Sequence, residues 1–338
     1  MQDQDQHDAT GTGPGRHGPA GCHSPRDRSV PADERSRSEP TGPRVSPAAA
    51  AEGVLGLLNG PLVAGEVMAR WTSAMALAVD TVAGTRVVGV LAAEASGVPN
   101  GLRLAARAAT EPFAGYHAGD PVFVGAGQVC LQGWQIRPTR SYATAVGLIR
   151  PDEDRVRSLA ALVSGHELGV PSSAVDAVRS ALAGGHTAEL RTSCSGLVGL
   201  GAGLTPGGDD VLAGLLVGLR AVGRAAPLQQ IAAAIAPRMA ARTTMFSADL
   251  LRLAAYGHAS TETLGLLREL DRRRPDTDLA ALERATASLL AVGHTSGADL
   301  ATGLLIGLTG PSTRPTARAR TRTGDRSAHT AHRISPAT

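Results

Sequence analysis

The sequence predicts an α+β protein in which a small β-rich N-terminal module is followed by a mainly helical C-terminal half. Val, Ile, Phe and Trp form short runs separated by glycine-rich turns over 82–140. Long runs rich in Ala and Leu follow Pro151. Both ends of the 338-residue chain are almost free of large apolar side chains. We therefore expect disordered N- and C-terminal tails around a folded body.

The same changes in composition divide the chain into four segments. The C-terminal tail holds six arginines and one acidic residue, so the net charge of +3 lies in this tail rather than in the folded body. A nucleic-acid surface on the body is therefore not predicted. The expected segments are a disordered tail over 1–48, a helix plus β-rich module over 49–143, a helical domain over 144–310 and a disordered basic tail over 311–338.

The N-terminal segment is expected to begin with helices and continue with strands. Alanine- and leucine-rich residues predict a helix over 49–62 and a second over 65–79. Residues 86–91 have the composition of a strand. A hairpin follows, with strands over 122–124 and 128–136 and its turn at Gly125 to Gly127.

Helix signals dominate after residue 150. The acidic run from Asp152 to Asp154 suits a helix N-terminus, and the next helix opens at Ser172 and ends at Gly184 and Gly185. The core of this half must consist of Leu, Ala and Val, because aromatic residues make up only 2% of the chain. Further helices are expected over 211–222, 228–241, 244–257, 261–270, 279–292 and 299–308.

The most informative segment is a glycine-rich loop that leads into an apolar helix, GLGAGLTPGGDDVLAGLLVGL from Gly199 to Leu219. Its glycines permit positive φ angles and expose N–H groups, while Thr, Pro and Asp open helices. A helix start of this kind attracts anions. The expected anion-binding residues here are Gly201, Gly203, Thr205, Gly207 and Gly208.

A second copy of this pattern occurs 89 positions later. Gly208 and Asp210 correspond to Gly297 and Asp299, and each pair precedes a helix with spaced glycines. We expect two turns that face each other as a pseudo-symmetric pair. Glycine is costly inside helices, so close helix packing explains Gly214, Gly218, Gly303 and Gly307. Close packing does not explain the acidic turns, and Thr295, Ser296, Gly297 and Asp299 join the candidate binding residues.

These segments resemble the AllH-like family, whose best-placed member is a subunit of bacterial oxamate carbamoyltransferase. The resemblance lies in GVPNGLR from Gly97, in GLGAGLTPGGDD from Gly199, in Arg242-Thr243-Thr244 with Ser247 and Leu250-Leu251, and in GHTSGAD from Gly293. It covers roughly 83–308. The family usually has Ser where this chain has Gly207.

The resemblance implies carbamoyl transfer between carbamoyl phosphate and oxamate or oxalurate, in purine and allantoin breakdown, by a multi-subunit assembly. Such transfer needs a phosphate cradle, a donor to the carbonyl oxygen and a cation for the acceptor carboxylate. The glycine loop offers the N–H groups, and Arg242 offers a bidentate guanidinium. The further binding candidates are Thr243, Thr244, Ser247, Asn100 and Arg103.

Asp209, Asp210 and His294 are the candidate catalytic residues. The two aspartates can orient an attacking amide or hold Mg²⁺ through water, so Mg²⁺ is a possible cofactor although none is certain. The simpler alternative is structural: an aspartate caps a helix, Arg242 pairs with a carboxylate and the glycines form a tight turn. His294, as a lone histidine near a helix start, can equally be structural.

Two functions follow, and each places the chain in the cytoplasm with a small anionic substrate, with other subunits as partners, and without nucleic acid or membrane. The first is a subunit of an oxamate carbamoyltransferase-like assembly. The second is a non-catalytic ligand-binding or scaffolding subunit of an acyl-CoA synthetase-like protein. The three cysteines have no disulfide or metal-ligand spacing, which fits a reducing compartment. No apolar signal segment opens the chain.

Overall fold

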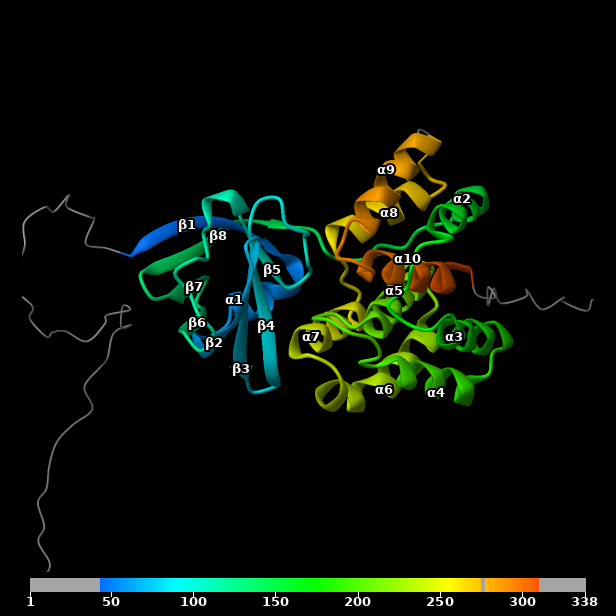
Figure 1. Ribbon diagram of the computed structural model, residues 1–338, viewed down its shortest axis with the longest axis horizontal. Coiled ribbons are helices and arrows are strands. Elements are labelled where there is room, and N and C mark those ends of the chain that lie inside the picture. Colours follow the sequence, from blue (N-terminus) through cyan, green and yellow to red (C-terminus); the bar gives the residue numbers. More distant parts are fainter. Residues whose placement is uncertain (1–42, 275–276, 310–338) are drawn as a thin grey trace, which may run out of the picture. The chain divides into compact units, whose positions relative to one another are not determined.

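The computed structural model describes residues 43–274 and 277–309, and Figure 1 shows its helices and strands. The predicted order, a β-rich module followed by a helical half, is confirmed. The first strand already begins at Arg44, ahead of the position where the N-terminal tail was expected to end. The predictions of disorder for 1–42 and 311–338 lie outside the described residues.

The chain divides into two compact units. The first combines the residues up to Val146 with Thr243–Arg268, and the second combines Gly147–Arg242 with the residues from Glu269 onward. Backbone hydrogen bonds join the late segment to the first unit: Val146 donates to Gly257 at 2.8 Å, and Ala259 donates to Thr144 at 2.8 Å. The first unit is therefore built from two separate stretches of sequence.

The first unit contains a closed β-barrel. Around the barrel the strands follow the order β1-β5-β4-β3-β2-β6-β7-β8, and β1 closes it by pairing in parallel with β8. The strands are β1 (Arg44–Ala51), β2 (Val63–Arg70), β3 (Ala74–Thr81), β4 (Gly84–Leu91), β5 (Gly101–Leu104), β6 (Pro121–Gly125), β7 (Gln128–Leu131) and β8 (Trp134–Tyr142). Short helical turns lie at η1 (Glu52–Val54), α1 (Leu55–Leu58) and η2 (Ala108–Thr110).

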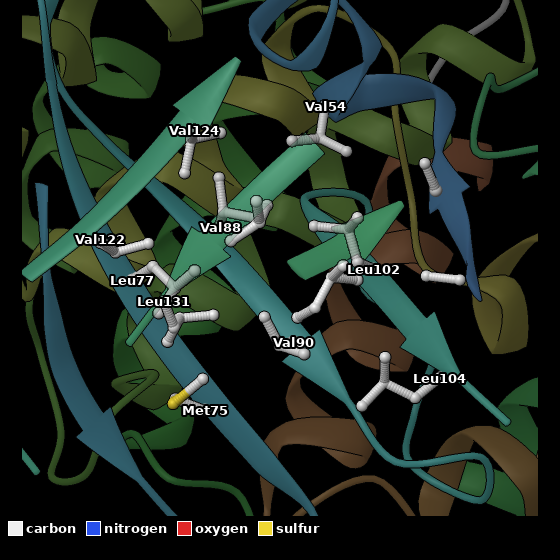
Figure 2. Close-up of a cluster of buried hydrophobic side chains, with 14 of the residues drawn as sticks. Val54, Met75, Leu77, Val88, Val90, Leu102, Leu104, Val122, Val124 and Leu131 are labelled. Atoms are coloured by element: carbon white, nitrogen blue, oxygen red, sulfur yellow. The ribbon is translucent and has the colours of Figure 1, made fainter. Parts of the chain in front are cut away.

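Aliphatic side chains fill the barrel. Met75 and Leu77 of β3, Val88 and Val90 of β4, and Leu102 of β5 are fully buried and lie in one cluster (Figure 2). Alternate residues of each strand supply these side chains, as the two-residue period of a half-buried strand requires. Burial of this cluster is the main stabilising contribution within the barrel.

The two predicted N-terminal helices are wrong. Residues 49–62 begin as the end of strand β1, where Ala49 pairs with Arg103 of β5 and with Arg140 of β8. Only the four residues of α1 are α-helical there. Residues 65–79 form parts of β2 and β3. Pairing on both edges inside a closed barrel outweighs the intrinsic preference of alanine for helix.

The strand predictions are largely confirmed. Residues 86–91 lie within β4, and β6 and β7 form the predicted hairpin, with positive φ at Gly125, Ala126 and Gly127. The predicted single strand over 128–136 is instead two strands. Gly133 adopts a φ of 70° and turns the chain between β7 and β8.

The remaining helices match most of the predicted ones, and α4 is an addition. Asp152 caps α2 by accepting hydrogen bonds from the N–H groups of Asp154 and Arg155, both at 3.1 Å. Gly185 ends α3 in the left-handed region. The helices are α2 (Glu153–Val163), α3 (Ser172–Gly184), α4 (Thr187–Leu197), α5 (Gly207–Ala221), α6 (Ala225–Arg242), α7 (Met245–Ala255), α8 (Thr261–Leu270), α9 (Leu279–Leu290) and α10 (Ser296–Thr309).

Helices α5 and α10 pack along each other in the second unit (Figure 1). A Cβ added at Gly214 would overlap the carbonyl oxygen of Leu300, and one added at Gly303 would overlap that of Val211. These contacts are reciprocal, because a shift of 89 positions converts one pair into the other. The predicted pseudo-symmetric helix pair is therefore present, and close packing explains its glycines.

Within the described residues, the structure contains no helix that is both long and apolar enough to cross a membrane.

Candidate functional site

The predicted site residues fall into both units, and each group is described within its own unit. In the second unit, the loop between α4 and α5 has positive φ angles at Gly199, Gly201 and Gly203 of 71°, 108° and 99°. Gly201 to Gly203 are exposed. Across the described part of the chain, no acceptor lies in hydrogen-bond geometry to their three N–H groups. These groups are available to an anion.

Asp209 holds this loop in place. The residue is 2% exposed, and its Oδ1 accepts a hydrogen bond from the N–H of Gly199 at 2.9 Å. The carboxylate thus ties the first residue of the loop to the first turn of α5. This contact supports the structural interpretation of Asp209 as a group that stabilises the turn.

Asp210 lies in a different environment from its neighbour. The carboxyl group is buried and interacts with the hydroxyls of Thr205 and Ser296, which are 3.0 Å apart. Its Oδ2 atom has no hydrogen-bond partner among the described residues. Burial raises the pKa of Asp210 to about 8, with the two hydroxyls opposing the shift and the charges of Asp299 and Asp209 adding to it.

Asp299 is the symmetry counterpart of Asp210 and is completely buried. Both of its carboxylate oxygens accept from the N–H of Gly169 at 3.1 Å. Burial raises its pKa, while the hydrogen bonds from Gly169 and Thr295 act in the opposite direction. The repeated motif therefore brings a second buried carboxyl group toward the first.

The space around Gly207 is too small for a side chain. A Cβ at this position would lie 2.8 Å from Oδ2 of Asp299 and 2.8 Å from the Cα of Gly169. The Ser that the family usually has here would require these neighbours to shift. Gly169 is similarly restricted, because its own Cβ would lie 2.9 Å from the same Asp299 oxygen.

Two predicted residues of this unit are on the surface. His294 is exposed before α10, and Arg242 is exposed as the last residue of α6. Within the described ranges, Arg242 has no carboxylate at ion-pair distance, so the structural alternative that it pairs with an acid is not supported. Thr205 and Thr295 are half-buried.

In the first unit, Asn100 belongs to a buried polar cluster that the sequence did not reveal. Its Nδ2 donates to Oδ2 of Asp249 at 3.3 Å and to the carbonyl of Val87 at 3.0 Å. Asp249, 4% exposed on α7, also binds Arg86 of β4 and Arg252 of α7. The sequence offered one signal for this cluster, an acidic residue within the otherwise apolar run that forms α7.

The other predicted residues of this unit have structural contacts. Thr244 caps α7 by accepting from the N–H of Ser247 at 3.0 Å, and Thr243 precedes it. Arg103 donates to the carbonyl of Ala95 at 3.1 Å. Its guanidinium also lies 5.5 Å from the centre of the Tyr142 ring.

A metal site is not evident from the side chains. Within residues 43–274 and 277–309, no group of three or more His, Cys, Asp or Glu side chains has the arrangement of a metal site. The suggestion that Asp209 and Asp210 hold Mg²⁺ remains a prediction.

The family comparison agrees with the expected resemblance. Residues 197–308 match the family model described as oxamate carbamoyltransferase subunit AllH. The match contains the glycine loop, both buried aspartates of the repeat and Asp249. It does not extend to the predicted segment from Gly97 to Arg103. Neither the curated proteins nor the solved structures give a match.

Proposed function

We propose that this chain is a subunit of a cytoplasmic oxamate carbamoyltransferase-like assembly that acts in purine and allantoin nitrogen breakdown. The reaction transfers a carbamoyl group between carbamoyl phosphate and oxamate. The observation that carries the proposal is the exposed glycine loop, with unpaired N–H groups, inside the residues that match the subunit family. Its substrates are small anions, which suits such a loop.

The loop is proposed to bind the phosphate group or the carbonyl oxygen of carbamoyl phosphate. Gly201, Ala202 and Gly203 are exposed, and the positive φ angles of Gly201 and Gly203 are ones that only glycine adopts readily. Fixed backbone dipoles can stabilise developing negative charge without reorganisation during the reaction. Asp209 fixes the start of this loop and so acts as a positioning residue.

Asp210 is proposed to exchange the proton that transfer requires. When the oxamate nitrogen attacks the carbamoyl carbon, the bond from that carbon to the phosphate oxygen breaks and the nitrogen loses a proton. At neutral pH a carboxyl group with a pKa of about 8 is mainly protonated, so in this proposal Asp210 donates its proton to the leaving phosphate oxygen, and the carboxylate that results accepts the proton that the nitrogen loses. The half-buried hydroxyls of Thr205 and Ser296 connect it toward the surface.

The remaining candidate groups of this chain are proposed to act where it meets another subunit of the assembly. Arg242 and His294 are exposed in the second unit, so both can face another subunit. In this proposal Arg242 binds the acceptor carboxylate, and His294 donates or accepts a hydrogen bond at the reacting groups. Mg²⁺ is tested as an additive, since carbamoyl phosphate is itself a metal-binding anion.

A steady-state assay of the assembly tests this function. The complex is purified through a tag on this chain, and phosphate release from carbamoyl phosphate is measured with and without oxamate and Mg²⁺. Asp210→Asn should lower kcat by about 100-fold or more, within the range for loss of a general acid or base. The control Asp176→Asn makes the same change at an exposed site on α3.

The results separate the two candidate functions. Loss of transfer in Asp210→Asn, with subunit composition and the control unchanged, supports a catalytic subunit. If the complex transfers the carbamoyl group and the variant does so at the normal rate, the assignment of Asp210 fails. If the variant weakens assembly by size exclusion but the saturated complex has normal kcat, the chain is a scaffolding or ligand-binding subunit.

A further inference from the structure

A pocket in the first unit is lined by none of the residues used in the proposed function. Its volume is about 510 Å³, and its walls come from α1, the end of β3, β4, α7 and the residues that follow α7. This volume is in the range of pockets for small metabolites. Two guanidinium groups, those of Arg86 and Arg252, line it.

A single buried acid holds both arginines. Arg86 Nε donates to Asp249 Oδ1 at 2.6 Å, and Arg252 Nε donates to the same oxygen at 3.1 Å. The Asp249 side chain is 2% exposed, whereas those of Arg86 and Arg252 are 21% and 28% exposed. The Asp249 carboxylate is therefore buried in its contacts with the two arginines, while the guanidinium groups of Arg86 and Arg252 remain partly exposed.

The arrangement leaves one positive charge and several donors unused. Among the described residues, no acceptor lies in hydrogen-bond geometry to the Nη atoms of Arg86. Nη2 of Arg252 is buried 3.0 Å from Asp249, whereas Nη1 has no acceptor in hydrogen-bond geometry among the described residues. Burial lowers the pKa of Arg252, and the charge of Asp249 opposes that shift. An added anion would satisfy these donors.

The other walls carry one titratable group, the imidazole of His258, and are otherwise uncharged. Leu57 of α1 and Leu253 of α7 contribute apolar surface. Tyr256 lines the rim with 69% of its surface exposed, and its ring centre lies 5.6 Å from the Arg252 guanidinium. Gly56 lines the pocket without a side chain. A cationic end and a neutral remainder match a molecule with one anionic group.

We infer that this pocket binds a small organic acid, with its carboxylate on the Nη donors of Arg86 and Arg252. Two arginines and one aspartate leave a net charge of +1, which matches a carboxylate better than a phosphate dianion. The planar donors of a guanidinium fit a carboxylate in two parallel hydrogen bonds. The neutral body of the acid then lies against Leu57 and Leu253.

Ligand-observed NMR titrations of the full chain test this inference, with oxamate, benzoate and inorganic phosphate as separate probes. Arg86→Gln should weaken binding of the carboxylates by at least 10-fold. Arg70→Gln, an exposed site on β2 with the same change of charge, should leave it unchanged. Arg86→Gln also alters the buried cluster, so a second pair of variants, Tyr256→Glu and Tyr256→Gln, is compared. The side chains of these two variants have the same shape and differ only in the charge that they place at the rim. Only Tyr256→Glu should weaken binding.

Binding of a carboxylate in this pocket does not require carbamoyl transfer. Saturable binding of oxamate or benzoate that depends on Arg86 and on the charge at Tyr256 supports it, whether or not the assembly is active. Three results overturn it: neither carboxylate binds, binding is insensitive to both sites, or phosphate binds there at least as tightly. A charge added to the glycine loop, Ala202→Glu, should leave this pocket unaffected.

Discussion

Asp210 shows how burial and hydrogen bonding act against each other on one carboxyl group. Its pKa rises from 3.8 to about 8 in the folded protein, mainly through burial. Between these pH values the unfolded chain releases a proton that the folded chain keeps. The free energy of unfolding should therefore fall as pH rises from about 4 to 8.

Asp210→Asn tests this linkage directly. Asn stays neutral, so the variant should lose much of the pH dependence and gain stability over the wild type as pH approaches 8. A shift of this size corresponds to a few kcal/mol. Urea unfolding at several pH values measures it, with Asp176→Asn as the exposed control. Parallel pH profiles for wild type and Asp210→Asn would contradict the account of burial.

At the scale of elements, the helix pair α5 and α10 depends on glycine at its crossing. Gly214→Ala or Gly303→Ala would place a Cβ against a backbone carbonyl oxygen of the other helix. Each should lower the free energy of unfolding by about 2 kcal/mol or more, as for other overpacked sites. Gly196→Ala on α4 has no atom within 4 Å, so it should be neutral or stabilising by up to about 1 kcal/mol.

Chemical denaturation of the three variants gives the comparison. Similar effects at Gly196 and Gly303 would mean that the crossing tolerates a methyl group. If both helix-crossing variants unfold like the wild type, the close packing of the pair is not a source of stability.

The sequence predicted these helices well because their signals are local. The 89-residue repeat, the caps and the spaced glycines are all visible in the sequence. The helices expected over 49–62 and 65–79 were wrong because β1 to β3 are stabilised by partners far away in the chain. Local propensity cannot report such pairing.

The candidate site was predictable to a similar extent. Asp210, Thr205 and Ser296 come together from the two copies of the repeat, as the sequence suggested. Arg86 and Asp249 were missed, because they are 163 positions apart and neither belongs to a recognisable motif. Only the pairing of α7 with the barrel strand brings them into contact.

At the scale of the whole molecule, the first unit needs two separate stretches of chain. A fragment of residues 43–146 lacks α7, so Arg86 and Asn100 lose their contacts with Asp249. This fragment should unfold at a lower temperature than the same fragment joined by a flexible linker to 243–268. Circular dichroism melts of both fragments measure the difference. Equal melting temperatures would show that the barrel is complete without its late segment.

The function proposed for this chain depends on anion binding by the exposed glycine loop. The most direct measurement is calorimetric titration of the full chain with carbamoyl phosphate and with phosphate, each with and without Mg²⁺. We expect saturable binding that Ala202→Glu weakens at least 10-fold and that Ala202→Gln, which has the shape of Glu without its charge, preserves. Binding that is identical in both variants, or absent from the wild type under every condition, would contradict it.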